Sequence, residues 1–300
     1  MEIATKCAIC GEYSNSDVHL PANGLGSRPV NELFSARRLP DRIYYQWVRC
    51  KSCNLLRSDP VHEVDLAELY EKSGFDYSSE LEGLTKTYLK LVDNLLTDKK
   101  SKLSIYEVGG GNGFFLAAAK DAGYKEVCGV EPSAEAIKMA RPDIKGSLIK
   151  SMMGPGVIPS KSFDVGAMFH TLDHLPDPAA VLVACKDALV PGGLFVAAVH
   201  NERSISARLL GGKSPIFDIE HTYLFSQSTA KKLLERAGFV DVSSGIYWNT
   251  YSLAYLLHLI PINQDLKTRV LSSLIGSILG KIKVTVPLGN IWVSGRRPNQ

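Results

Sequence analysis

The stretch IYEVGGGNGFF, residues 105–115, is apolar at its start, carries an acid at Glu107 and then contains four glycines. A short apolar run bounded by glycine predicts a buried strand over residues 105–108. Glycine has no Cβ, so the segment after the strand can turn tightly and let a bound molecule approach the backbone. The stretch therefore predicts a strand, a ligand-binding loop and a helix that begins at residue 113.

The same order of strand, loop and helix continues along the chain. Apolar runs predict further strands at 126–130, 163–168, 194–199, 240–243 and 290–295. Helical spacing predicts helices at 84–96, 113–122, 133–139, 178–189 and 228–237. Strands that alternate with helices favour an α/β fold on a parallel, doubly wound sheet. The apolar stretches 251–260 and 265–282 also have helical spacing and predict a helical C-terminal cap.

Composition and these patterns suggest three parts: a unit at 1–60, a helical linker at 61–100, and a main domain at 101–300 with a helical insertion at about 250–283. The first part ends at Asp59-Pro60, a dipeptide typical of a turn or hinge. The net charge of +3 comes without a block of one sign, so neither an acidic tail nor a nucleic-acid stripe is indicated. We find no apolar signal segment at the start and no apolar run long enough to span a bilayer, so we expect a cytoplasmic protein.

The glycine spacing distinguishes between possible ligands of the loop. A dinucleotide fingerprint needs a third glycine where Phe114 stands, and a P-loop needs a Gly-Lys-Ser/Thr that the stretch lacks. The spacing that fits is acid-x-Gly-x-Gly-x-Gly, formed by Glu107, Gly109, Gly111 and Gly113. An acid at the strand end suits a ligand that bears positive charge.

This spacing resembles motif I of the class I S-adenosylmethionine-dependent methyltransferases. Three later segments are similar to the same family in the same order: VCGVE at 127–131, FDVGAMFHTLDHLPDP at 163–178 with its Asp173-His174 pair, and LVPGGLFVAAV at 189–199. The resemblance covers about residues 104–245 and implies a seven-stranded, Rossmann-like methyltransferase sheet that binds S-adenosyl-L-methionine. The cofactor-binding residues that it implies are Glu107, Gly109, Gly111, Gly113, Glu131, Pro132 and His170.

Four of the six cysteines form two C-x-x-C pairs in the first unit: Cys7, Cys10, Cys50 and Cys53. In a reducing compartment such pairs favour metal ligands over disulfides, and two pairs suit tetrahedral zinc. All four positions would be used, so we predict a closed, structural zinc site. The alternative is four unrelated buried cysteines.

A zinc unit ahead of a methyltransferase domain resembles two groups: sugar and natural-product methyltransferases, and a ribosomal RNA guanine methyltransferase group. The segment DIEHTYLFS at 218–226 is similar to an E-H segment of the sugar group, although its tyrosine spacing differs. Histidine has an unperturbed pKa near operating pH, which suits a general base. The candidate bases are His170, His174, His200, His221 and Tyr223. We assign the catalytic roles to His221, His174 and Tyr223, with His221 as the first choice.

The acceptor is the open question. After the predicted fourth strand, FHTL at 169–172 replaces the Asn/Asp-Pro-Pro-aromatic motif of amino-group methyltransferases, which favours an oxygen or carbon of a small molecule or glycan. RNA is a second possibility, because basic residues gather in the first unit. They are Arg28, Arg37, Arg38, Arg42, Arg49, Lys51 and Arg57. A non-catalytic binding protein is a third, and the late apolar helices allow a homodimer.

Overall fold

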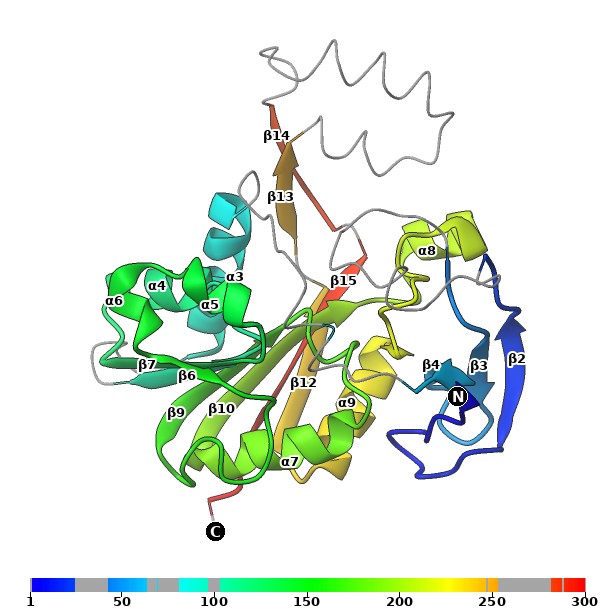
Figure 1. Cartoon of the computed structure of the whole chain (residues 1–300), viewed down its shortest axis with the longest axis horizontal. Helices are drawn as coiled ribbons and strands as arrows, with labels where there is room; N and C mark the ends of the chain where they lie inside the picture. The colour runs from blue at the N-terminus through cyan, green and yellow to red at the C-terminus, as the bar shows by residue number, and fades with distance from the viewer. Residues whose placement is uncertain are drawn as a thin grey trace.

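The computed structural model describes residues 2–24, 43–63, 69, 81–96, 103–246, 248–252, 282–287 and 289–299. Its centre is a seven-stranded sheet with the order β12-β15-β10-β9-β6-β7-β8 (Figure 1). Strand β15 runs antiparallel to both of its neighbours, while β10, β9, β6, β7 and β8 are parallel. The strands are β6 (Ser104–Val108), β7 (Glu126–Glu131), β8 (Leu148–Lys150), β9 (Phe163–Phe169), β10 (Leu189–His200), β12 (Val240–Ile246) and β15 (Asn290–Arg296).

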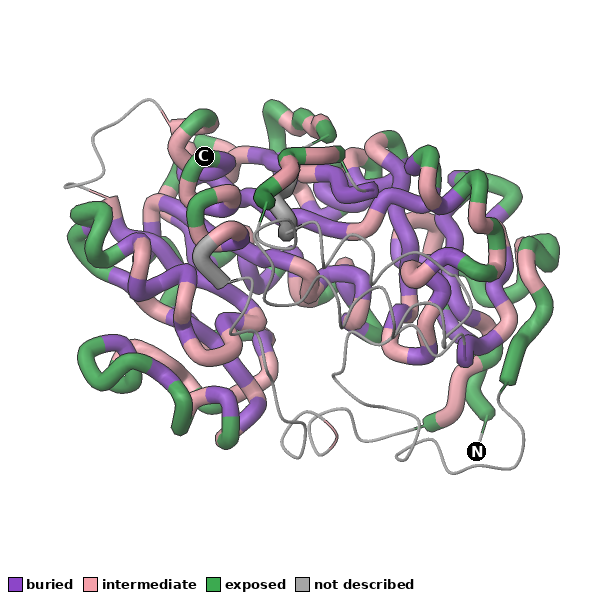
Figure 2. Tube along the Cα trace, turned by 90° about the horizontal axis from the view of Figure 1, so that it is seen from above, coloured by how far each residue is buried: buried purple, intermediate pink, exposed green. Residues whose placement is uncertain are grey.

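Helices cover both faces of this sheet, as a parallel sheet requires. The helices α3 (Leu81–Leu95) and α4 (Phe114–Asp121) pack on one face, where Tyr88 and Phe115 join a core with Val165. The helices α7 (Pro178–Ala188) and α9 (Gln227–Arg236) pack on the other, where Leu182 and Leu233 share a core. Figure 2 shows the buried residues running through the interior of this layered body. Short helices complete the described part: α5 (Ala134–Lys138), α6 (Pro142–Lys145), α8 (Ile205–Leu210) and η2 (Gly211–Lys213).

The strand order reverses between β6 and β9, so the chain runs outward from the centre in both directions. Ligands of doubly wound sheets bind at the carboxyl ends of the strands at such a reversal. The loops after β6, β7, β9 and β10 all leave from this edge. The loop after β6 contains the predicted glycines, and the predicted acid Glu131 is the last residue of β7. The doubly wound sheet predicted from the alternation of strands and helices is therefore confirmed.

The N-terminal unit is a second, smaller sheet with the order β11-β4-β3-β2, made of β2 (Ser16–Leu20), β3 (Trp47–Cys50), β4 (Leu56–Ser58) and β11 (Tyr223–Leu224). Strand β11 belongs to the main domain and completes the edge of this sheet by pairing with β4. Beside it, β1 (Glu2–Ile3) pairs with β5 (Val61–His62), so the N-terminal unit extends past the boundary predicted at residue 60. Pairing across the boundary satisfies strand edges that would otherwise be exposed.

The side chain of Arg57 links several segments of the N-terminal unit by hydrogen bonds. Its side chain is fully buried, and it donates to the carbonyl oxygens of Thr5 at 3.0 Å and Tyr13 at 2.6 Å and to Ser16 Oγ at 2.7 Å. Asp59 forms an ion pair with it at 3.4 Å. A buried charge is tolerated only when its hydrogen bonds are satisfied in this way. At the predicted hinge, the Asp59 carboxylate also accepts from the N–H of Thr5 at 2.8 Å, and the Asp59 N–H donates to the carbonyl oxygen of Gln46 at 2.8 Å.

Several sequence predictions need correction or lie outside the described residues. Strand β8 was missed because its three residues are too few to show a period. The insertion predicted as helical begins and ends in strands, since β13 (Asn249–Ser252) pairs with β14 (Lys283–Val286). The predicted helix 251–260 is thus wrong at its first two residues. The rest of it, most of 265–282 and the helical cap that they would form lie outside the described residues.

Candidate active site and metal centre

The glycine loop lies between β6 and α4, and its three spaced glycines have different roles. Gly109, Gly111 and Gly113 have φ values of 72°, 53° and 72°, which L side chains rarely adopt. A Cβ at Gly109 would lie 2.2 Å from Thr171 Oγ1, and one at Gly113 would lie 2.7 Å from Ile144 Cγ2. At Gly111 no atom lies within 4 Å of such a Cβ. Two glycines thus allow close packing, and the middle one leaves the backbone open to a ligand.

Two buried acids flank this loop. The Glu131 carboxylate accepts hydrogen bonds from the backbone N–H groups of Gly111 and Ser133, each at 2.8 Å. Glu107 is 2% exposed, and its Oε2 atom has no hydrogen-bond partner among the described residues. Burial and, next, the charge of Glu131 raise the pKa of Glu107 well above its usual value. Burial also raises the pKa of Glu131, although its two backbone hydrogen bonds oppose this effect.

These features meet the needs of S-adenosyl-L-methionine. The unpartnered oxygen of Glu107 and the open face of Gly111 are the two observations that fit a ligand with positive charge and close backbone contact. Glu131 would hold the ribose hydroxyls, because its orientation is fixed by two backbone donors while its oxygens keep further acceptor capacity. Pro132 follows Glu131 in the same loop, directly before α5 and its capping residue Ser133.

A cluster of histidines lies at the neighbouring strand ends. His170 follows β9 directly and His200 is the last residue of β10; the N–H of His170 donates to the carbonyl of Ala198 at 2.8 Å. The rings of His170 and His200 are 4.8 Å apart. The completely buried Asp173 lies among them, 2.6 Å from His200 Nδ1 and 4.0 Å from His174 Nε2. Adjacent parallel strands thus place imidazoles around one carboxylate.

His221 reaches the same cluster from the segment before β11. Its ring lies 4.7 Å from the rings of both His174 and His200. Its Nδ1 is 2.9 Å from the carbonyl oxygen of Ile216, which can only accept, so Nδ1 carries the proton and Nε2 has the lone pair. Burial, reinforced by the two neighbouring imidazoles, lowers the pKa of His221 to about 3. His221 also lines a cavity of about 540 Å³ between the N-terminal strand and α7.

Tyr223 was predicted to be catalytic, but its hydroxyl forms its hydrogen bonds outside the histidine cluster. Its hydroxyl donates to the carbonyl oxygens of Lys6 at 2.8 Å and Pro176 at 3.2 Å, and the residue is 1% exposed. Burial raises the pKa of this phenol, so the group stays protonated. The contacts make Tyr223 a link between the N-terminal unit and the main domain. A catalytic role for it stays a prediction that the geometry does not support.

The structure brings several of the other predicted site residues close together, while their roles stay predictions. His174 and His221 share the histidine cluster with His170, which the sequence had assigned to the cofactor. The sequence reasoning missed the pairing of His200 with Asp173 and the packing of Thr171 on Gly109. One signal was present for the first of these: His200 directly follows the strand predicted at 194–199 and Asp173 closely follows the one predicted at 163–168, so both were expected at the carboxyl edge of a parallel sheet.

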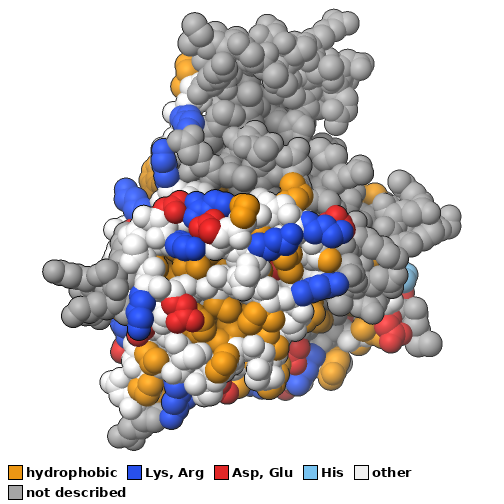
Figure 3. Space-filling view, turned by 60° about the vertical axis from the view of Figure 1, so that its left-hand side comes forward, with side chains coloured by type: hydrophobic (Ala, Val, Ile, Leu, Met, Phe, Trp, Pro, Cys, Tyr) orange, Lys and Arg blue, Asp and Glu red, His pale blue; other side chains and the backbone are white. Residues whose placement is uncertain are grey.

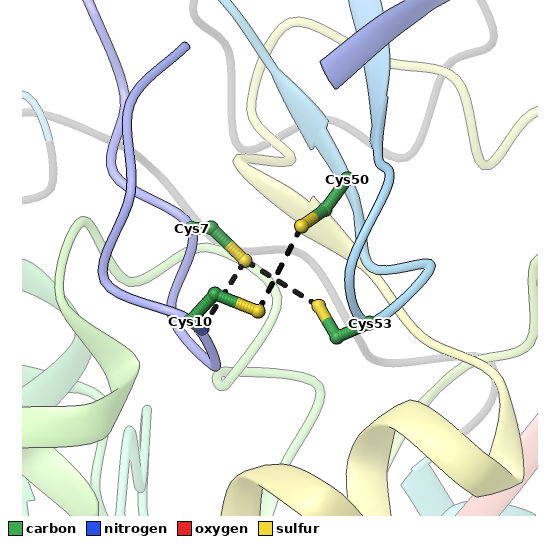
Figure 4. Close-up of side chains that lie close together, drawn as sticks. All are labelled: Cys7, Cys10, Cys50 and Cys53. Carbon is green, nitrogen blue, oxygen red and sulfur yellow. Dashed lines mark hydrogen bonds between the residues drawn. The ribbon is translucent and has the colours of Figure 1, made fainter. Parts of the chain in front are cut away.

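The four cysteines of the N-terminal unit converge on one point, as Figure 4 shows. Cys7 Sγ lies 3.5 Å from Cys53 Sγ, and Cys50 Sγ lies 3.8 Å from Cys10 Sγ. All four sulfur atoms lie within 4.8 Å of one another. Four sulfurs held ~2.3 Å from a zinc ion at tetrahedral angles would be ~3.8 Å apart, so the cluster has the dimensions of a zinc site.

Comparison with known proteins agrees with this geometry. Residues 81–244 match the family model described as a methyltransferase domain. The ubiquinone biosynthesis O-methyltransferase of Idiomarina loihiensis is 27% identical in an alignment 171 residues long, which covers 51% of this chain and 68% of the relative. That of Psychrobacter arcticus is 26% identical in an alignment 170 residues long, which covers 51% of this chain and 65% of the relative. About a third of each relative is therefore not matched.

The fold has its counterparts among solved structures. A SAM-dependent methyltransferase from Archaeoglobus fulgidus aligns with a TM-score of 0.51 and 19% identity, over 77% of this chain and all of its own. Because the family model covers more than half of the chain, the chain belongs to the methyltransferase-domain family, and it is a class I S-adenosylmethionine-dependent methyltransferase. Within the described residues, no helix has the length and apolarity that crossing a bilayer demands.

Proposed function

We propose that this chain methylates an acidic hydroxyl group, such as a phenol, of a small organic molecule. The observation that carries the proposal is the set of imidazoles around Asp173, placed beside the glycine loop at the carboxyl ends of β9 and β10. A phenol has a pKa near 10, so an imidazole can remove its proton during the reaction. The two curated relatives are named as O-methyltransferases, which supports oxygen as the acceptor atom.

In this reaction, different residues of the chain would bind the cofactor and accept the proton. When bound, S-adenosyl-L-methionine supplies a methyl group activated by a sulfonium. Glu131 and the backbone at Gly111 would hold that cofactor. Burial raises the pKa of Glu107, and the positive charge of a bound cofactor would favour its ionised form. An imidazole of the cluster accepts the proton that the acceptor hydroxyl loses. Holding both reactants in line is the larger contribution, because orientation removes much of the entropic barrier.

The assay for this proposal has two parts. Binding of S-adenosylhomocysteine is measured by calorimetry for Glu131→Gln, with Glu135→Gln on the exposed face of α5 as the matched control. We expect at least a tenfold loss for Glu131→Gln and no more than a twofold change for the control, because a lost charge-assisted hydrogen bond is worth ~1.5–3 kcal/mol. Methyl transfer is then measured on phenols, aliphatic alcohols and amines. Transfer to amines but not to phenols would refute the acceptor assignment.

We also propose that Cys7, Cys10, Cys50 and Cys53 hold a structural zinc ion. The support is the spacing of their sulfur atoms and the use of all four as ligands, which leaves no open position for catalysis. Metal content of the purified protein measured by plasma mass spectrometry should approach one zinc per chain. Cys50→Ser should lose it, whereas Cys128→Ser, outside the cluster, should keep it. Equal zinc content in both variants would contradict the site.

A small-molecule acceptor is favoured over RNA by the charges of the N-terminal unit. Of the seven basic residues named in the sequence analysis, Arg49 pairs with Glu202 at 2.9 Å, Lys51 pairs with Asp17 at 2.9 Å, and Arg57 is buried. The others, Arg28, Arg37, Arg38 and Arg42, lie outside the described residues. Figure 3 brings forward the side of the main domain on which α4 and α6 lie, and there too basic side chains stand next to acidic ones. A salt-dependent retention of ribosomal RNA would overturn this preference.

A further inference from the structure

Resting on the proposed function, we infer that His200 is the general base of methyl transfer and that Asp173 is its positioning residue. The candidates are four imidazoles in one cluster, so their partners must distinguish them. His200 Nδ1 lies 2.6 Å from Asp173 Oδ2. A carboxylate can only accept in such a contact, so Nδ1 is the donor and Nε2 carries the lone pair that takes a proton. The His200 side chain is 25% exposed, which leaves it accessible to an acceptor.

The surroundings of Asp173 keep its carboxylate ionised and its position fixed. Its side chain is completely buried. Although burial alone would raise its pKa, the His200 hydrogen bond and the nearby imidazoles hold the pKa of Asp173 well below its usual range. Its backbone carbonyl accepts from the N–H groups of Thr222 at 2.9 Å and Tyr223 at 3.1 Å. A fixed carboxylate behind one imidazole nitrogen orients the ring and stabilises the imidazolium that forms, as in other histidine bases.

The other imidazoles have different surroundings. His221 has a carbonyl oxygen at its Nδ1, and burial together with His174 and His200 lowers its pKa to about 3, so it accepts a proton poorly. His174 Nε2 is turned toward Asp173 Oδ1, 4.0 Å away, and its side chain is 17% exposed. The ring of His170 contacts the rings of Tyr88 and His200, at centroid distances of 6.4 Å and 4.8 Å.

The charged and titratable groups around His200 come from two other segments. The loop after β9 supplies His170, Asp173 and His174, and the segment before β11 supplies His221. Two residues beyond His200, Glu202 is already paired with Arg49 and so does not compete for the imidazole. Asp173 is therefore the carboxylate that acts on His200 among the described residues.

Methyl transfer needs no reactant besides the acceptor and the methyl donor. The acceptor O–H bond breaks and its proton moves to His200 Nε2, while the oxygen electron pair forms the bond to the methyl carbon. The carbon–sulfur bond of the methyl donor breaks, and its electron pair remains on the neutral sulfide. The imidazolium beside the Asp173 carboxylate later loses its proton to solvent.

Kinetics with substituted phenols test the base directly. His200→Gln should lower kcat by about 100-fold or more with little change in S-adenosylhomocysteine affinity, the size expected for a lost general base. At pH 8 the loss should shrink for 4-nitrophenol, which is largely ionised there, compared with 4-methoxyphenol, which is not. His221→Gln should lose less than tenfold, and the control His19→Gln, on the exposed strand β2, should stay within twofold. Equal losses for both phenols in His200→Gln would overturn the assignment.

A second measurement does not depend on finding an acceptor. In protein labelled with nitrogen-15 at histidine and saturated with S-adenosylhomocysteine, the Nδ1–H proton of His200 should resonate far downfield. It should move upfield in Asp173→Asn, whose amide oxygen is neutral, and disappear in Asp173→Ala. If no phenol is methylated but these resonances behave as expected, the proposed function fails while the pair of residues stands. A resonance that is insensitive to both substitutions would overturn the pair.

Discussion

Gly109 offers the sharpest test of how the glycine loop is built. In Gly109→Ala the new Cβ would lie 2.2 Å from Thr171 Oγ1 and 2.8 Å from Thr171 Cγ2, with the backbone at a φ of 72°. A left-handed conformation costs a non-glycine residue ~1–2 kcal/mol, and forcing extra atoms into a packed site costs ~1–3 kcal/mol more. The variant should therefore lose ~2–5 kcal/mol in the free energy of unfolding.

Gly111→Ala is the matched control, because its φ of 53° carries a similar backbone cost while no atom lies within 4 Å of the new Cβ. It should lose only ~1–2 kcal/mol of stability. Its affinity for S-adenosylhomocysteine should fall more than its stability suggests, since the methyl group occupies the open face of the loop.

Urea unfolding of the apo protein and calorimetric titration provide the two readouts. In the double variant Gly109→Ala/Thr171→Ala, the contacts with Oγ1 and Cγ2 are gone, so a favourable coupling of ~1 kcal/mol or more should appear in the double-mutant cycle. Equal destabilisation by the two alanine variants, or a coupling of zero, would refute the view that Thr171 is what requires glycine at position 109.

Two further predictions concern the contact between the N-terminal unit and the main domain, and the pH dependence of the free energy of unfolding. Tyr223→Phe leaves two buried carbonyl oxygens without their donor and should cost ~1–3 kcal/mol in urea unfolding, whereas Tyr13→Phe at the surface should cost nothing measurable. Because the folded-state pKa of His221 is lowered to about 3, the unfolded chain binds more protons below its unperturbed pKa of ~6.5, and stability should fall as pH drops through that window. His221→Gln should flatten this fall by up to ~1.4 kcal/mol per pH unit, and an unchanged slope would show that other groups cause it.

Much of the fold could be predicted because its signals are local. The acid and glycines at 107–113, the strand over 104–108 and the helices over 178–188 and 227–236 are each encoded within a dozen residues. Backbone conformation and burial period are properties of a short segment, so the sequence alone determined the doubly wound sheet, the cofactor loop and the two cysteine pairs.

What only the tertiary structure decided are contacts between residues far apart in the chain. Strand β11 completes the sheet of the N-terminal unit through β4, and Tyr223 donates to the carbonyl oxygen of Lys6, which lies 217 residues earlier in the chain. His221, the first choice for the base, is held neutral by burial, while His200 gains the Asp173 carboxylate. No local pattern contains these facts, because hydrogen-bond partners and desolvation depend on which segments the folded chain brings together, and they decide which of several identical imidazoles can take a proton.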